Sequence, residues 1–181
     1  MSGYEGKIEI MYSPKGGCEK RLVELIGSTR KTIRAMVFSA TLTSVAEGLV
    51  EAKRNGVNIQ MVLDKLQTKG GQGKFHDALE KAGIAVRLYS PGPRRCMHHK
   101  VGIFDGEVVS TGSFNWTNNA QNNNDENLVV ISAADVAEAY RKIFDELWEK
   151  ASPESRSRVG RKLRRFGRFV LTFLARRSSY E

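Results

Sequence analysis

Short apolar runs alternate with helix-like segments over the first ninety residues of the chain. The predicted strands are residues 7–12, 32–39, 57–64 and 84–89, which are short and rich in Ile and Val. The predicted helices are residues 18–30, 44–55 and 74–82, with Gly56 and Gly83 standing where the last two would end. This alternation indicates a βαβα order.

Past residue 90 the pattern changes to strand followed by strand, with a further strand predicted at residues 127–131. It closes with a helix predicted at residues 133–150, for which Ser132 is a suitable N-cap. Apolar residues recur along it at helical spacing: Val136, Tyr140, Ile143, Phe144 and Leu147. Together these elements predict an α/β fold of mixed topology, in which a mixed β-sheet is flanked by helices on both faces.

The chain has 181 residues, 40% apolar and 27% charged, a profile typical of one globular domain with a hydrophobic core. It contains no run of roughly 18 to 20 apolar residues that could span a membrane. Its first ten residues lack the basic start and apolar segment of a signal peptide, so we expect a cytoplasmic protein. Cys18 and Cys96 are too few for a disulfide framework, and we expect both to be reduced thiols.

The net charge of +9 is concentrated at the C-terminal end. Residues 153–181 carry nine Lys and Arg against Glu154 and Glu181, which is +7 and leaves +2 for residues 1–152. Because proline ends a helix, the boundary is placed between Ser152 and Pro153. The predicted organisation is a nearly neutral globular domain, residues 1–152, followed by a strongly basic tail, residues 153–181.

The tail has an amphipathic pattern. Its apolar residues follow a 4-3-4-3 spacing on the side opposite the basic ones: Val159, Leu163, Phe166, Val170 and Phe173. Residues 156–177 could therefore lie on an anionic membrane surface, bind nucleic-acid phosphates or dock on the preceding domain. A tail that only improves solubility is the remaining interpretation.

Residues 97–115, MHHKVGIFDGEVVSTGSFN, are two strand-like runs separated by Asp105-Gly106, a strong hairpin signal. A two-residue loop pairs Phe104 with Glu107, and the same register places His98 opposite Ser113. Alternation along the strands then predicts one polar face: His98, Lys100, Thr111, Ser113 and Asn115. The other face is predicted to point towards the core, apart from His99: Met97, His99, Val101, Ile103 and Val108.

The polar face suits a phosphodiester. Lys100, the Ser113 hydroxyl and the Asn115 amide can donate hydrogen bonds to phosphate oxygens and neutralise charge in a phosphoryl-transfer transition state. His98 can attack phosphorus or move a proton near neutral pH. The cluster has no set of carboxylates to hold Mg²⁺, so we expect chemistry that uses neither a metal ion nor a cofactor.

Two acidic residues have different expected roles. Asp105 lies at the turn, too far along the strand to orient His98, and is expected to stabilise the turn or an adjoining basic group. Glu126, entering the next predicted strand, is the nearest candidate for an acidic partner of His98.

Several neighbouring residues could contribute to a substrate groove. Trp116 follows Asn115 and could stack a base at the mouth of the site, although core packing is at least as good an interpretation. Residues 118–127 form a polar tract, predicted as a loop, whose amides could line the groove, Asn118 and Asn124 among them. The glycine-rich residues 68–74 lack the P-loop pattern and are predicted as a flexible rim.

The spacing of these residues matches a known signature. His98, Lys100, Asp105 and the run from Gly112 to Asn115 fit HxK(x)4D(x)6GSxN, and Glu126 follows where a histidine-orienting glutamate is placed. The chain therefore resembles the phospholipase D superfamily over roughly residues 5–150. With a single copy of the motif, it is similar to the short dimeric branch of bacterial Nuc-type endonucleases and Zucchini-type enzymes.

The resemblance implies a mechanism and a partner. One histidine forms a phosphohistidine and a second protonates the leaving oxygen; since one hairpin supplies one histidine, a C2 homodimer bringing two copies of His98 together is implied. It also implies the following roles: Lys100 and Asn115 hold phosphate, Ser113 assists, Glu126 orients the imidazole and Asp105 is mainly structural. We expect a metal-independent endonuclease acting on single-stranded nucleic acid. The alternatives are a phospholipase acting on anionic lipid such as cardiolipin, and an inactive module that binds nucleic acid or membrane.

Overall fold

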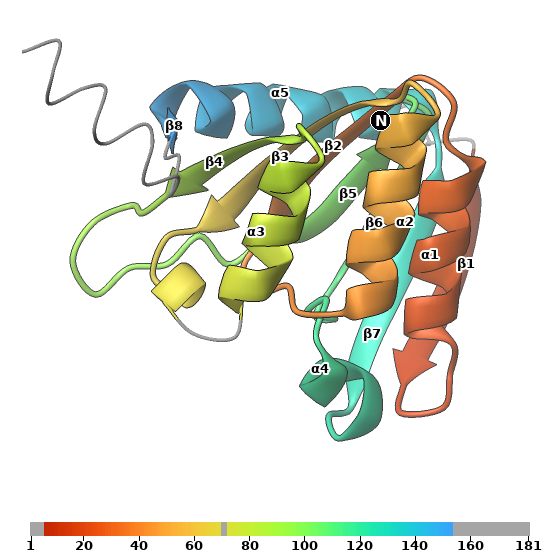
Figure 1. Ribbon diagram of the computed structural model, residues 1–181. Helices are drawn as coiled ribbons and strands as arrows, with labels where there is room; N and C mark the ends of the chain where they lie inside the picture. Colours follow the sequence, from red (N-terminus) through yellow and green to blue (C-terminus); the bar gives the residue numbers. More distant parts are fainter. Residues whose placement is uncertain (1–5, 70–71, 154–181) are drawn as a thin grey trace, which may run out of the picture.

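The fold is organised around one mixed sheet, shown in the computed structural model of Figure 1, which describes residues 6–69 and 72–153. Its strands are β1 (Lys7–Ser13), β2 (Thr32–Val37), β3 (Asn58–Asp64), β4 (Ala85–Tyr89), β5 (Lys100–Phe104), β6 (Val108–Gly112), β7 (Glu126–Ser132) and β8 (Ser152–Pro153). They lie in the order β1-β7-β6-β5-β2-β3-β4-β8. β2, β3 and β4 are parallel and the other neighbours antiparallel.

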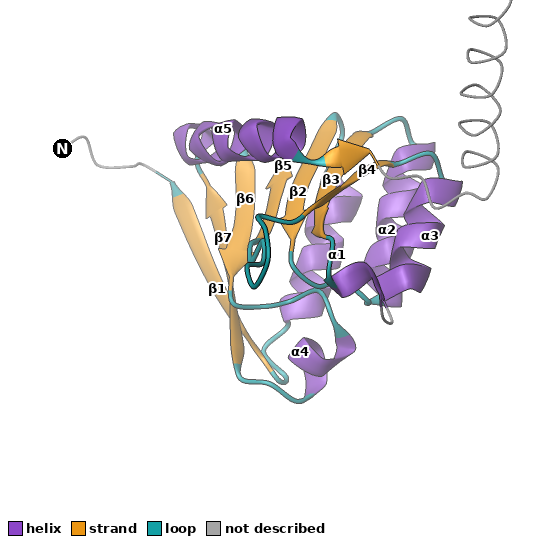
Figure 2. Ribbon diagram, turned by 90° about the vertical axis from the view of Figure 1, so that its left-hand side faces the viewer, coloured by secondary structure: helices purple, strands orange, loops and turns teal. Residues whose placement is uncertain are grey.

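Helices cover both faces, which confirms the predicted architecture (Figure 2). They are α1 (Cys18–Ser28), α2 (Thr43–Arg54), α3 (Gln72–Lys81), α4 (Asn118–Asn122) and α5 (Ala134–Lys150), with a 3-10 turn at Gln67–Lys69. α1, α2 and α3 bury apolar side chains such as Leu22, Leu49 and Leu79 against one face. α5 buries Ala137 and Phe144 on the other, over Met36 and Val62. No helix within the described residues is long and apolar enough to cross a membrane.

Three local predictions were wrong. Ser132 does not cap α5: it pairs with Lys7 as the last residue of β7, so Ala133 takes the cap position. α3 begins at Gln72, inside the predicted glycine-rich loop, where the Gln72 side chain accepts a hydrogen bond from the Ala40 N–H (3.0 Å). The polar tract at residues 118–127 is not all loop, because α4 occupies its first half and β7 begins within its last residues.

The β5–β6 hairpin differs from its predicted register by one residue. Its loop contains three residues, Asp105, Gly106 and Glu107, and the Glu107 N–H donates to the Phe104 carbonyl (3.0 Å). Phe104 therefore pairs with Val108 instead of Glu107. Within this loop, Asp105 and Gly106 both take positive φ, 53° and 72°.

This shift moves two side chains to the opposite face from the one predicted. Val108 packs on the α1–α3 side, and Thr111 lies with Val109 on the α5 side. The predicted pairing of His98 with Ser113 does not form, because β5 begins only at Lys100. Apart from Pro153, which lies in β8, the predicted basic tail is outside the described residues.

Candidate active site

The candidate site lies where several strands end at one edge of the sheet. β5 begins there with Lys100, β6 ends there with Gly112 and β7 begins there with Glu126. The three ends coincide because β5, β6 and β7 are successive antiparallel neighbours. α4 lies at the same edge (Figure 1). The Ser13 hydroxyl, at the end of β1, donates to the Ala120 carbonyl of α4 (2.7 Å).

His98 and Lys100 form a close pair at this edge. The Lys100 Nζ lies 3.0 Å from Nδ1 and 3.1 Å from Nε2 of His98, and it donates to the His98 carbonyl (2.9 Å). The ring of Phe38 flanks both: its centroid is 4.5 Å from that of the imidazole and 4.9 Å from the ammonium. The imidazole is exposed and the ammonium is buried behind it.

Burial is what sets the electrostatics of this pair. Only 5% of Lys100 is exposed, and burial lowers the pKa of its ammonium, while the negative charge of Glu126 opposes that shift. The positive charge is therefore held in a poorly solvated place, where an anionic ligand would interact with it strongly.

The loop after β6 is shaped by Gly112 and Asn127. Gly112 has φ of 130°, and a Cβ there would lie 2.4 Å from both the backbone oxygen and the Oδ1 of Asn127. In the close approach that glycine permits, the Ser113 N–H donates to Asn127 Oδ1 (3.0 Å) and the Ser113 hydroxyl accepts from the Asn127 N–H (3.0 Å). The hydroxyl is exposed and keeps its own proton for a ligand.

Three of the remaining polar residues, Asn119, Asn124 and Glu126, form a connected row. Asn119 donates to Asn124 Oδ1 (2.9 Å), and Asn124 donates to Glu126 Oε1 (2.9 Å). Glu126 is half-buried and acts electrostatically on Lys100. The Oδ1 of Asn115 is buried without a hydrogen-bond partner in the described part of the chain. Asn118 is exposed as the first residue of α4.

Trp116 does not line the site. It is fully buried in the core on the α1–α3 side, and its backbone N–H donates to Ser39 (3.0 Å) while its carbonyl accepts from Thr41 (2.7 Å). The base-stacking interpretation of this residue was therefore wrong. The rigid placement of Trp116 instead fixes the chain immediately after Asn115.

Asp105 lies at the other end of the hairpin. Its carboxylate accepts hydrogen bonds from three successive backbone N–H groups, those of Arg30 (2.8 Å), Lys31 (2.7 Å) and Thr32 (2.8 Å). Burial raises the pKa of Asp105, but these three donors and the charge of Lys31 lower it by more. The net pKa lies below the ordinary value, so the ionised carboxylate is favoured.

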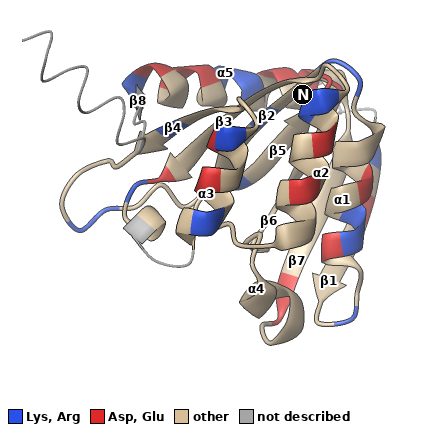
Figure 3. Ribbon diagram, viewed as in Figure 1, with Lys and Arg blue, Asp and Glu red and all other residues tan. Residues whose placement is uncertain are grey.

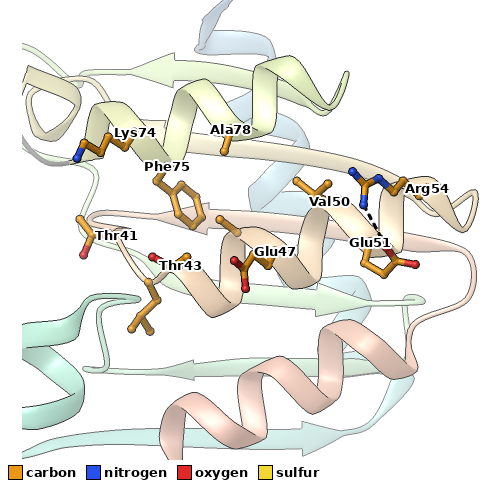
Figure 4. A pocket seen from close by; sticks show the side chains of 11 residues that line it. Thr41, Thr43, Glu47, Val50, Glu51, Arg54, Lys74, Phe75 and Ala78 are labelled. Carbon is orange, nitrogen blue, oxygen red and sulfur yellow. Dashed lines mark ion pairs between the residues drawn. The ribbon is translucent and has the colours of Figure 1, made fainter.

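Two other features lie outside this edge cluster. A pocket between α2 and α3 is lined by Thr41, Glu47, Phe75 and their neighbours, and an ion pair joins Glu51 to Arg54 at one end (3.5 Å; Figure 4). Within the described residues, a group whose atoms are close enough together to hold a metal ion is His76, Asp77 and Glu80 on α3. His76 is fully buried, as expected for a packing residue.

Sequence reasoning missed Phe38, Asn127 and Asp64. Phe38 follows β2, and its apolar character gave no sign that its ring would flank His98. Asn127 was counted only as part of the polar tract. Asp64, the last residue of β3, is fully buried and accepts the Met97 N–H next to His98 (2.8 Å). All three act through contacts between segments far apart in the chain.

Comparisons with known proteins give a consistent result. The family model described as "Cardiolipin synthase, PLD-like domain" matches residues 22–148. A solved structure of a phospholipase D family member, Nuc from Salmonella typhimurium, superposes with a TM-score of 0.79 at 32% identity, covering 83% of this chain and 99% of Nuc. NucT from Helicobacter pylori has the same fold, with a TM-score of 0.75 at 22% identity, covering 83% of this chain and 100% of NucT.

Curated relatives carry lipid-related names. A mitochondrial cardiolipin hydrolase of Chlamydomonas reinhardtii is 34% identical over 129 residues, and a phospholipase D of Rickettsia bellii is 33% identical over 135 residues. These alignments cover 71% and 74% of this chain. The chain spans only 56% and 65% of the length of these two relatives.

Proposed function

The chain belongs to the phospholipase D superfamily, and on that premise we propose that it hydrolyses phosphodiester bonds of single-stranded nucleic acid without a metal ion. The observation that carries this proposal is the His98–Lys100 pair, an exposed imidazole in contact with a buried ammonium. A nucleophile beside a preorganised positive charge is what attack on a phosphodiester anion requires.

In the proposed reaction a ring nitrogen of His98 attacks phosphorus and the bond to the leaving oxygen breaks. A second imidazole gives its proton to that oxygen, then removes a proton from the water that hydrolyses the phosphohistidine. Lys100, the Ser113 hydroxyl and the Asn115 amide hold the non-bridging oxygens. Glu126 orients an imidazole, and Asp105 supports the scaffold.

We assign the second imidazole to a second copy of the chain. The chain has three histidines: His76 is buried in α3, and His99 holds the variable position of the motif, its carbonyl bonded to the Phe38 N–H (2.7 Å). His98 of a partner copy related by a twofold axis would supply the missing group, so that one site forms per dimer.

An apolar surface suited to the second copy borders the site. α5 packs over β2 to β6 and leaves the same face of β1 and β7 open (Figure 2). There Ile8, Ile10 and Tyr12 are 62%, 72% and 63% exposed, across from Val129 and Ile131 of β7. An uncharged patch of this kind is typical of a protein interface, and β1 runs from it to the site edge at Ser13.

Basic charge near the site suits a polyanionic substrate. Exposed basic residues stand on loops at or leading to the site edge, at Lys15 after β1 and at Arg94 and Arg95 before His98; Figure 3 shows these basic segments. With the +7 of residues 153–181, they would attract a polyphosphate chain. The names of the curated relatives support the alternative hypothesis, that the substrate is a lipid.

The test of the reaction is cleavage of end-labelled single-stranded DNA and RNA in excess EDTA, with His98→Ala prepared identically. Cleavage by the parent alone is expected. Hydrolysis of cardiolipin vesicles with no cleavage of either nucleic acid would contradict the proposed nuclease function and favour a phospholipase. Activity that appears only when Mg²⁺ is added would overturn the metal-independent mechanism.

The test of the shared site is a mixing experiment. Parent and His98→Ala chains are unfolded together in defined ratios, refolded and assayed. If each site needs His98 from both copies, an equal mixture keeps about a quarter of the parental activity, because only a quarter of random dimers have two; independent sites would keep about half. Ile10→Asp is expected to give an inactive monomer in light scattering, and an active monomer would contradict the assignment.

A further inference from the structure

We propose that Asp64 is a positioning residue, whose buried carboxylate fixes the backbone just before His98 and thereby sets the direction of the imidazole. This inference rests on the role of His98 in the proposed function. Asp64 is the last residue of β3 and is 0% exposed. A carboxylate in such a place must be held by donors, since an unpaired one would be strongly destabilising.

Within the described residues, three backbone N–H groups hold the Asp64 carboxylate. Oδ2 accepts from Met97 (2.8 Å), and Oδ1 accepts from Leu66 (2.9 Å) and Gln67 (3.3 Å). The two oxygens therefore connect two segments, the turn after β3 and the chain that enters β5. Such charge-assisted hydrogen bonds are the stronger ones in proteins.

The bond to Met97 closes the base of a loop. Residues 90–96 leave the sheet after Tyr89 and return at Met97, and they include Pro91, Pro93 and Arg94, the last with φ of 60°. At the departing side the Lys65 N–H donates to the Tyr89 carbonyl (2.9 Å). At the returning side Asp64 holds Met97. Successive residues of β3 and its turn thus hold both ends of the loop.

Closing this loop places His98. Met97 is 3% exposed and packs under α5 with Met36, Val62 and Val101. On the other side of His98, the His99 carbonyl accepts the Phe38 N–H (2.7 Å). His98 is therefore held between two anchored neighbours. A displacement of about 1 Å at a reacting group can lower a rate by about two orders of magnitude.

The test compares Asp64→Asn with Asp105→Asn. Both substitutions replace a carboxylate that accepts three backbone N–H bonds by an amide with one acceptor oxygen, but Asp105 lies at the far end of the hairpin. The substrate is bis(p-nitrophenyl) phosphate in EDTA, and each full-length variant is assayed at a fixed interval below its own Tm. We expect kcat to fall about 10- to 100-fold for Asp64→Asn with KM within about threefold, and kcat for Asp105→Asn to stay within about twofold.

A second readout does not depend on activity. In protein with ¹⁵N-labelled histidine, the imidazole signals of His98, identified by their loss in His98→Ala, are expected to shift in Asp64→Asn and to stay in place in Asp105→Asn. If the parent hydrolyses no phosphodiester, the proposed function fails while these signals still decide whether Asp64 positions the ring.

Three outcomes would overturn the inference: parental kcat and unmoved His98 signals in Asp64→Asn; equal losses of kcat in the two variants; or a rise in KM alone. If Asp64→Asn does not fold, Asp64→Glu decides. It keeps the charge but displaces it by one methylene, and a folded protein with reduced kcat and unchanged KM is expected. Parental kcat for Asp64→Glu would then refute the role.

Discussion

The two ends of the β5–β6 hairpin, about five residues apart along each strand, differ in how their polar groups are satisfied. At the turn, the Asp105 carboxylate accepts three backbone N–H bonds and its own N–H donates to Thr32 (2.9 Å). At the opposite end, an ammonium is buried against an imidazole and Asn115 Oδ1 has no partner in the described chain.

This contrast separates stability from function within one element. Charge-assisted hydrogen bonds that are fully formed in the folded state stabilise it. A buried charge with incomplete solvation costs folding free energy, but its interactions can strengthen when an anionic ligand binds. The turn end is therefore expected to matter for folding, and the site end for catalysis at some expense of stability.

The largest expected effect is at Lys100. Replacing it by Met should lower kcat by about 10²- to 10³-fold, because the charge that we propose faces the phosphate is lost. The free energy of unfolding should stay within about 1 kcal/mol of the parent's or rise, because a buried charge is removed. Assays on a chromogenic phosphodiester and urea unfolding measure the two quantities, with the exposed Lys20→Met as control.

The pH dependence of the unfolding free energy of Lys100→Met tests whether the Lys100 charge destabilises the folded protein. Burial lowers the pKa of Lys100 in the folded protein, so its buried charge costs stability below that lowered pKa, and the cost is lost as pH rises from the lowered pKa to the ordinary value of 10.5. Any advantage of Lys100→Met should therefore shrink in alkaline solution. An advantage that grew with pH would show that the ammonium is favourably placed in the folded state.

Gly112→Ala should combine both kinds of loss. A Cβ at this position meets the Asn127 backbone oxygen at 2.4 Å, and φ of 130° is a conformation that side chains rarely adopt. We expect about 3 kcal/mol less stability and displacement of Ser113, with reduced turnover. Thermal unfolding and kinetics test this; Gly27→Ala, with open space around its Cβ, is the control. Parental kcat in Gly112→Ala would show that the position of the Ser113 loop does not affect catalysis.

Asp105→Asn should act on stability. Loss of a carboxylate that holds three N–H groups is expected to cost about 2 kcal/mol at neutral pH. Because the pKa of Asp105 is lowered in the folded state, its contribution is complete above the ordinary value of 3.8 and is lost as pH falls through the lowered pKa. The parent and the variant should therefore converge in acid. A stability difference that persisted well below that pH would contradict the role of the ionised carboxylate.

Local pattern was sufficient for most of the fold. Residues 57–64 were predicted as a strand and β3 is Asn58–Asp64; residues 18–30 were predicted as a helix and α1 is Cys18–Ser28. Apolar periodicity reports which side of an element is buried, and tight turns carry their own residue signals, so these predictions need no distant contacts.

What failed depends on contacts between distant segments. The hairpin loop has a third residue, and its Asp105 accepts hydrogen bonds from residues 30–32. These residues are too far away in the sequence to enter a prediction from local pattern. Trp116 is buried because Ser39 and Thr41 bind its backbone. The motif brought His98, Lys100 and Glu126 to attention, whereas Phe38, Asp64 and Asn127 join them only through the tertiary fold.

The smallest expected effect lies midway along the hairpin, at Ser110. Its hydroxyl is buried opposite Gly102 and has no hydrogen-bond partner within the described residues. An unsatisfied buried polar group costs free energy, so Ser110→Ala should leave stability unchanged or raise it by less than about 1 kcal/mol. Turnover should remain parental, because Ser110 is two residues from Gly112 and neither end of the hairpin depends on it. Urea unfolding at matched protein concentration measures the change. A loss above about 1 kcal/mol would mean that the hydroxyl has a partner, such as an ordered water, and that polar satisfaction extends from the turn to the middle of the hairpin.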